Sequence, residues 1–244
     1  MHLASIYGYV NVIEFLVKEV IDHIENDETR EKYRNLQDYK GRSCVFYAAA
    51  EGRQSIIGYL VESGSNPNLG TSENHYEPGS TPLMASAERN EIECFNILVD
   101  KGADIFKTRE DGADAIYIAA RFGHLDLIQT FFESLLEDKR GKDVTKMMTR
   151  PTFKGRTPIL TAALHGHTLV LKEFLAHGAC IDHQDDRGFT AIMYAASQGH
   201  YDIVKILISN GANLCKRNKF HDNALRVAIL HNEPEIVKIL KSFT

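Results

Sequence analysis

The amino-acid sequence predicts an all-α solenoid of stacked helix pairs with turn or hairpin fingers along one edge. One segment is written nearly twice, as "KGRTPILTAALHGHTLVLKEFLAHGACID" and then as "DDRGFTAIMYAASQGHYDIVKILISNGAN". A small residue recurs in the same local pattern with spacings of 44, 38, 33, 43, 33 and 33 residues, at Ala4, Ala48, Ser86, Ala119, Ala162, Ala195 and Ala228. A unit of two amphipathic helices cannot bury both apolar sides alone, so neighbouring units must stack.

The first helix of each repeat is predicted from its two ends. Thr81-Pro82 and Thr157-Pro158 place a hydroxyl that can cap a helix N-terminus before a proline, which suits the first helical turn. Glycine ends this helix in most repeats because it adopts the left-handed conformation freely. Asn90 and Asn232 replace that glycine, and asparagine is the next best residue at positive φ.

The second helix is predicted from apolar residues at i, i+3, i+4 and i+7. Segments such as "YDIVKILISNG" and "IECFNILVDKG" carry this pattern. They end at Gly64, Gly102, Gly178 and Gly211.

A 33-residue period with "GSTPLMASA", "GRTPILTAA" and "GFTAIMYAA" resembles the ankyrin repeat. Seven copies in phase extend the resemblance over nearly the whole chain. It implies an ankyrin-repeat solenoid in a single domain, 1–244, with an incomplete first repeat and a divergent last one. The expected repeats are about 1–36, 37–69, 70–107, 108–150, 151–183, 184–216 and 217–244.

Three insertions depart from the repeat, near 22–36, 70–78 and 138–150. In the first and third, the apolar spacing continues through Val20, Ile21 and Ile24 and through Leu135 and Leu136. We therefore expect a second helix one to two turns longer than usual, followed by a charged loop. The polar insertion at 70–78 predicts an extended fingertip with an exposed aromatic, Tyr76. The first and third insertions are expected to serve either as solvated decoration or as a secondary docking site.

Composition places the chain among ordinary globular proteins. It is 43% hydrophobic, and its formal net charge of −5 is too balanced to indicate nucleic acid or an anionic membrane as the main partner. No apolar run approaches the ~20 residues of a membrane helix, and no secretory pattern opens the chain. We expect an intracellular, cytoplasmic protein, with a nuclear location as an alternative.

No motif of an enzyme active site is visible in the sequence. A phosphate loop, a nucleophile elbow and a HExxH helix are all missing, so we expect no catalytic residue, cofactor or metal. The four cysteines lack zinc-ligand spacing and are read as reduced thiols. His124, His167 and His200 follow a helix-ending glycine, where the resemblance implies a structural role in the turn.

The resemblance also implies where a partner binds. In ankyrin-like proteins the variable positions flank the Asp-x-x-Gly turn of each finger and precede the glycine that closes the first helix, and together they line a concave face. In the fingers these positions hold Tyr39, Lys40, Arg42, Asp111, Phe153, Lys154, Arg156, Asp186, Arg187, Phe189, Phe220 and His221. At the helix ends they hold Glu51, Arg89, Arg121, Phe122, His165, Gln198 and His231.

Aromatic and arginine side chains dominate interface hot spots, and this set contains both. Phe122, Phe153, Phe189 and Phe220 could form a ladder across consecutive repeats. Alternatively, each ring packs under its own finger. We expect at least two of the four to be exposed, because positions beside a turn have little core to reach.

The sequence thus predicts a non-enzymatic protein–protein interaction module, monomeric by itself, that binds a partner protein on its fingers and first helices. Two alternatives remain open. The chain could be the substrate- or partner-recruiting segment of a larger enzyme or pathogen effector, with the catalytic part elsewhere. It could also be a structural spacer, for which a featureless polar groove is expected.

Overall fold

The computed structural model describes residues 1–137 and 141–243. Sixteen α-helices and one π-helical segment form the regular structure of these residues. Apart from one isolated antiparallel bridge between Gln37 and Ser43, the described residues contain no β pairing. The all-α prediction is confirmed. The chain divides into two compact units, Met1–Ala115 and Ile116–Thr244.

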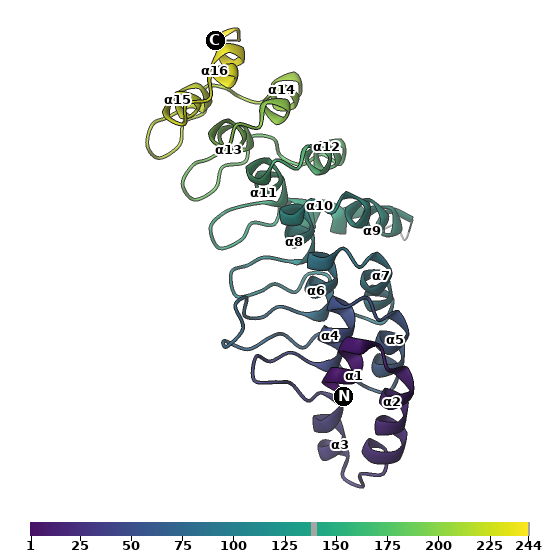
Figure 1. Cartoon of the computed structure of the whole chain (residues 1–244). Coiled ribbons are helices and arrows are strands. Elements are labelled where there is room, and N and C mark those ends of the chain that lie inside the picture. Colours follow the sequence, from purple (N-terminus) through teal and green to yellow (C-terminus); the bar gives the residue numbers. More distant parts are fainter. Residues whose placement is uncertain (138–140, 244) are drawn as a thin grey trace. The chain divides into compact units, whose positions relative to one another are not determined.

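The first unit contains two rows of helices. The helices are α1 (His2–Tyr7), α2 (Val10–Phe15), the π-helical η1 (Leu16–Ile21), α3 (Asp27–Arg34), α4 (Cys44–Ala50), α5 (Gln54–Glu62), α6 (Pro82–Arg89) and α7 (Ile92–Asp100). First helices α1, α4 and α6 contact one another in order, as do second helices α2, α5 and α7. Long loops leave the row of first helices and project sideways as fingers (Figure 1).

The second unit repeats this arrangement. Its helices are α8 (Ala115–Phe122), α9 (Leu125–Glu137), α10 (Gly141–Thr149), α11 (Pro158–His165), α12 (Thr168–Ala176), α13 (Ala191–Ser197), α14 (Tyr201–Ser209), α15 (Ala224–Leu230) and α16 (Pro234–Lys241). α11, α13 and α15 contact in order, and α9, α12, α14 and α16 form the second row. The loops before α11, α13 and α15 project as fingers from the first row (Figure 1).

The recurring small residue lies where first helices meet. It is 0% exposed in six repeats and 6% exposed at Ala4. Small side chains let neighbouring helices approach closely. Large apolar side chains fill the space beside the second helices, where Phe95, Phe132 and Phe174 are completely buried.

The predicted caps of the first helices are only partly present. The Thr81 hydroxyl accepts a hydrogen bond from the Met84 amide at 3.4 Å. The same prediction is wrong for Thr157, whose side chain makes no capping bond. Thr157 and its equivalent Thr190 are 2% and 0% exposed, so their side chains are packed as core residues instead.

The residues predicted to end the first helices adopt positive φ. Asn90 and Asn232, which replace glycine, have φ values of 59° and 58°. Of the three histidines that follow a helix-ending glycine, His167 and His200 have the structural role that the resemblance implied. His167 Nε2 lies 2.9 Å from the carbonyl oxygen of Arg121, and His200 Nε2 lies 3.2 Å from that of Leu164.

The insertions of the first and fourth repeats end in helices. α9 has 13 residues where α12 and α14 have 9, which confirms the expected elongation in the fourth repeat. In the first repeat α2 has six residues and continues as the π-helical η1 to Ile21. The predicted charged return loop is wrong, because α3 and α10 occupy that stretch. The Asn26 side chain caps α3 by accepting from the Thr29 amide at 2.8 Å, and α10 buries Val144, Met147 and Met148 at helical spacing. Part of the third insertion, 138–140, lies outside the described residues.

The insertion at 70–78 forms an extended finger. Its base is closed by the Thr71 amide, which donates to the Ser80 carbonyl oxygen at 3.0 Å. His75 is buried inside it, and Tyr76 is exposed as predicted.

Glycine at the end of a first helix has two possible causes: the positive φ of the backbone, and the histidine ring packed against it. Comparison of Gly166 with Gly211 separates these two causes. Gly166 and Gly211 have φ of +80° and +82°, but a Cβ on Gly166 would lie 2.7 Å from the His200 ring, whereas Gly211 faces open space. We expect Gly211→Ala to lower the free energy of unfolding by about 1 kcal/mol. Gly166→Ala should cost at least about 1 kcal/mol more, because the histidine must move.

Urea unfolding of both variants measures this difference. In a His200→Ala background the extra cost at Gly166 should disappear. Equal costs for the two single variants would show that the histidine contact does not constrain the turn.

Candidate functional site

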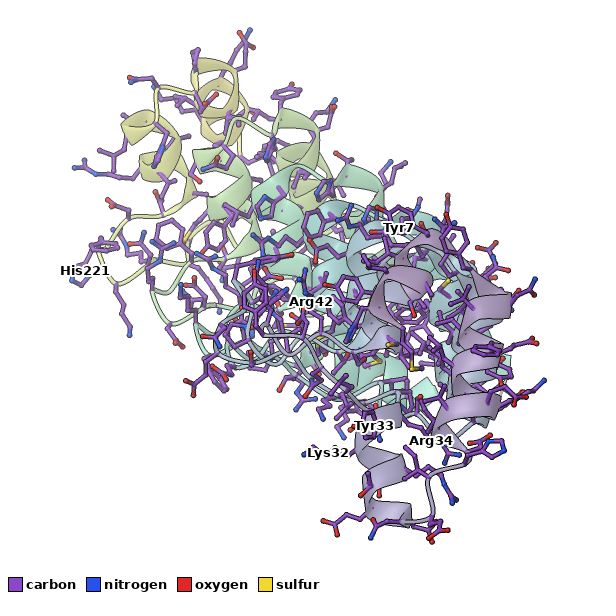
Figure 2. All side chains as sticks on the ribbon, turned by 60° about the horizontal axis from the view of Figure 1, so that its bottom comes forward. Tyr7, Lys32, Tyr33, Arg34, Arg42 and His221 are labelled. Carbon is purple, nitrogen blue, oxygen red and sulfur yellow. The ribbon has the colours of Figure 1, made fainter. Side chains whose placement is uncertain are left out.

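Each finger of the second unit is a tight turn closed by backbone hydrogen bonds. The amides of Gly155, Gly188 and His221 donate to the carbonyl oxygens three residues earlier, at 2.8, 2.8 and 2.9 Å. His221 has a φ of 63°, at the position where the other two fingers have glycine. Figure 2 shows His221 on the loop before α15, pointing away from the helices. Each turn presents two residues at its tip.

Backbone hydrogen bonds join consecutive fingers. The Asp186 amide donates to the Lys154 carbonyl oxygen at 3.2 Å, and the Lys219 amide donates to the Arg187 carbonyl oxygen at 2.9 Å. The fingertips of the second unit are therefore held in register. We call residues 151–156, 184–189 and 216–222 the finger face of this unit.

A buried tyrosine organises the middle finger. Tyr194 donates its hydroxyl proton to Asp185 Oδ2, and it accepts from Arg156 Nε at 3.1 Å and Arg187 Nη2 at 3.0 Å. Asp185 Oδ1 accepts from the backbone amides of Arg187 and Phe189 at 3.0 and 2.8 Å. Burial, and next the hydrogen bond to Asp185, raise the pKa of Tyr194. The network fixes one finger to its own first helix and reaches the preceding finger through Arg156.

The first unit repeats this device around Asp38. Arg42 Nη2 and the Tyr47 hydroxyl donate to Asp38 Oδ2 at 2.7 and 2.9 Å, and Asp38 Oδ1 accepts from the amides of Lys40 and Arg42. Arg42 is labelled in Figure 2. Burial alone would raise the pKa of the Asp38 carboxyl, but these hydrogen bonds hold it at about 2. Burial and the bond to Asp38 raise the pKa of Tyr47 to about 12.

None of the predicted binding residues is buried in the core. The exposed ones are Tyr39, Glu51, Arg89, Asp111, Phe122, Phe153, Lys154, His165, Asp186, Arg187, Gln198, Phe220, His221 and His231. The half-buried ones are Lys40, Arg42, Arg121, Arg156 and Phe189. The surface placement of this set is therefore as expected, while its role in binding stays a prediction.

Of the four phenylalanines, three are exposed and one packs under its own finger, so both arrangements that the sequence left open occur. Phe153, Phe220 and Phe122 are 74%, 64% and 42% exposed, which confirms that at least two are exposed. Phe189 instead packs on Tyr194, with ring centroids 5.2 Å apart, under the Arg187 guanidinium.

The helix ends of the second unit add histidines. His165 and His167 stack with ring centroids 6.2 Å apart. The pKa of His165 is lowered first by burial and then by the positive neighbours His167, Arg121 and Arg156.

Sequence reasoning missed Tyr47 and Tyr194, which hold the fingers. The available signal was a tyrosine nine residues after the aspartate of an Asp-x-x-Gly turn, in repeats two and six. It also left out Lys219, which is exposed on the last fingertip beside Phe220.

A second exposed apolar surface was also missed, on α1 and α2. Leu3 and Val12 are 70% and 46% exposed. At the position of Val12, the next two repeats place Ile56 and Cys94, which are both 1% exposed.

The described residues contain no group of three or more His, Cys, Asp or Glu side chains that could hold a metal ion. Among the helices in the described part of the chain, none has the length and apolar character needed to span a bilayer. The cysteines are free thiols, buried at Cys44 and Cys94 and exposed at Cys180 and Cys215.

Comparison with known proteins agrees with the repeat architecture. A family profile described as ankyrin repeats in three copies matches residues 69–144 and 130–218, together well over half of the chain. Over 98% of its length the chain superposes on 96% of the ankyrin repeat domain of Bcl-3, with a TM-score of 0.77 and 21% identity.

Curated relatives are longer proteins. The E3 ubiquitin-protein ligase XBAT32 of Arabidopsis thaliana is 31% identical over 157 residues, and the probable E3 ubiquitin-protein ligase XBOS32 of Oryza sativa subsp. japonica is 28% identical over 160. Each alignment covers 57% of this chain and 30% or 31% of the relative. The NF-kappa-B p105 subunit of Gallus gallus is 26% identical over 180 residues, covering 73% of this chain and 16% of that protein. The chain thus spans less than a third of the length of these relatives.

Arg42 tests the electrostatics of the first-unit finger. Replacing Arg42 with Gln should raise the pKa of Asp38 from about 2 towards its ordinary value of 3.8, because two charge-assisted hydrogen bonds are lost. In the wild type the lowered pKa stabilises the fold fully above about pH 3.8, and this contribution is lost as the pH falls towards 2.

A carboxyl-carbon NMR titration measures both pKa values. Arg217→Gln is the matched control, because Arg217 donates to the His221 carbonyl oxygen in the other unit and should leave Asp38 unchanged. A wild-type midpoint near 3.8 would contradict the network.

Proposed function

The chain belongs to the ankyrin repeat family, whose fold serves protein–protein interaction, and on that premise we propose that it is a non-enzymatic module that binds a partner protein with its fingers and first-helix ends. In the second unit this surface is the finger face with the helix ends at His165, Gln198 and His231. The observation that carries the proposal is the exposure of large aromatic side chains on turns that are rigidly held.

The division between buried and exposed positions supports this proposal. The positions that repeat unchanged are buried, as at Ala162, Ala195 and Ala228. The predicted binding positions differ from repeat to repeat, and all of them are exposed or half-buried. Because these positions meet solvent, their side chains can change with the partner while the fold is kept.

The rigidity of the fingers also supports a binding role. Phe153 and Phe220 are on turns whose tips are tied to the middle finger by backbone hydrogen bonds. An exposed aromatic on an ordered turn loses little conformational entropy when a partner buries it. Such residues are the usual hot spots of interfaces.

A second candidate function is recruitment for a larger enzyme. Two relatives carry the name of E3 ubiquitin-protein ligases, and this chain covers under a third of each. In that case the fingers would select the substrate while catalysis occurs elsewhere in the polypeptide. The full-length open reading frame distinguishes the two functions: a catalytic region supports recruitment, and its absence leaves the independent module.

Phe153→Ala with Phe220→Ala tests the binding surface. We expect the double variant to change the free energy of unfolding by less than about 1 kcal/mol, because both rings are exposed. The dissociation constant of a partner protein should rise about 30-fold, the equivalent of about 2 kcal/mol. The partner is identified by affinity purification with mass spectrometry, and its affinity is measured by biolayer interferometry.

The control is Lys205→Glu on α14, an exposed position of a second helix. It should leave the affinity nearly unchanged. If Lys205→Glu abolished binding and the phenylalanine variant did not, the second helices would be the binding surface.

A further inference from the structure

We propose that the finger face of the second unit binds an acidic segment of its protein partner, with apolar side chains of that segment seated on Phe153 and Phe220. This inference rests on the proposed function and specifies the chemistry of the partner. It follows from three features of the finger face: its net charge, the pairing of its acids, and the position of its cations between two exposed rings.

The finger face is basic in a chain that is acidic. Residues 151–156, 184–189 and 216–222 contain six lysines and arginines against three aspartates. The whole chain has a formal net charge of −5. The finger face of the second unit therefore carries a local excess of positive charge, which favours a negatively charged ligand.

Two of the three aspartates on this face are already engaged. Asp185 is buried and bonded to Tyr194, and Asp222 pairs with Arg226 at 3.1 Å. The lysines differ, because Lys154 and Lys219 are exposed and make no ion pair among the described residues. The net positive charge is thus available to a partner.

Exposed aromatic rings lie on the two outer fingertips and positive charges on all three, with Asp186 beside Arg187 on the middle tip. The first tip carries Phe153 and Lys154, and the last carries Lys219 and Phe220, with Arg187 on the tip between them. The interfinger hydrogen bonds keep these tips adjacent. A segment that crosses the row meets a ring at each end and positive charges between them, so a segment that combines carboxylates with apolar side chains complements it.

A short acidic segment fits better than a nucleic acid. A polyanion would extend beyond the fingers and meet the negative charge of the rest of the chain. Nucleic-acid binders carry a basic balance over the whole domain, and this chain does not.

Selection from a random 12-residue peptide library displayed on phage tests the proposal with the whole chain as bait. We expect the enriched peptides to be rich in Asp and Glu with intervening aromatic or aliphatic residues. The most enriched peptide, labelled with fluorescein, should bind less tightly as the salt concentration rises, because salt screens the exposed charges. Anisotropy measures its affinity.

The diagnostic variant is Lys154→Glu with Lys219→Glu, and we expect about tenfold or greater loss of affinity for that peptide. The matched control is Lys172→Glu with Lys205→Glu, which makes the same charge change at exposed positions of α12 and α14. It should change affinity by less than about twofold. Circular dichroism melting checks that both variants remain folded.

The outcomes separate this inference from the proposed function. Neutral or basic peptides that lose affinity in Phe153→Ala with Phe220→Ala would overturn the acidic preference and leave the finger face as the binding surface. Peptides that ignore all finger variants, or no enrichment at all, would overturn both. Tighter binding of a fluorescein-labelled 20-mer of thymidine than of the peptide would overturn the inference in favour of nucleic acid.

Discussion

The close approach of neighbouring first helices is the constraint on which the rest of the structure depends. A repeat of two short helices has too little core of its own, so its stability comes from contact with the repeats beside it. That contact requires a small side chain at one point of each first helix, which is completely buried at Ala48, Ser86 and Ala195. A larger side chain there would separate the helices and misalign the loops that leave them. The alignment of the fingers is a consequence of this packing.

The fingers vary in chemistry while keeping one backbone arrangement. Asp38 and Asp185 pair with a tyrosine, whereas the equivalent Arg109 is buried and bonds to Asp111 and Glu77. At the next equivalent position, the Thr152 hydroxyl accepts from the Arg156 amide. Several side chains thus stabilise the same turn, so the turn does not restrict the residues at its tip. This freedom explains how fingertips can be as different as Tyr39-Lys40 and Asp186-Arg187.

The fold could be predicted from the sequence because helix pairs that stack on one another need the same residue types at the same positions, which produces a regular period. The positions with positive φ could be predicted from the sequence even where asparagine replaced glycine, since few residues tolerate that conformation. The predictions of secondary structure were wrong where tertiary contacts, and not the local sequence pattern, determine whether a helix forms. α3 and α10 are short helices in charged segments. The Asn26 cap stabilises α3, and the burial of Val144 and Met147 stabilises α10. In the sequence, neither the cap nor the few apolar residues stand out from the charged residues around them.

The position of the site residues on the surface could be predicted from the sequence, but whether each one supports a finger or faces a partner could not. Exposure of Phe153 and Phe220 follows from their place on a turn, but the half-burial of Arg156 and Phe189 depends on Tyr194, which lies on a different element. A residue on a finger can therefore support the finger or face a partner. Only the structure separates these roles.

Hydrogen–deuterium exchange of the chain with and without its captured partner tests the central claim, that varied finger positions bind while repeated positions hold the fold. The account predicts new protection at backbone amides within 151–156, 184–189 and 216–222, with little change along α12 and α14. Protection confined to α12 and α14, with the fingers unchanged, would contradict it.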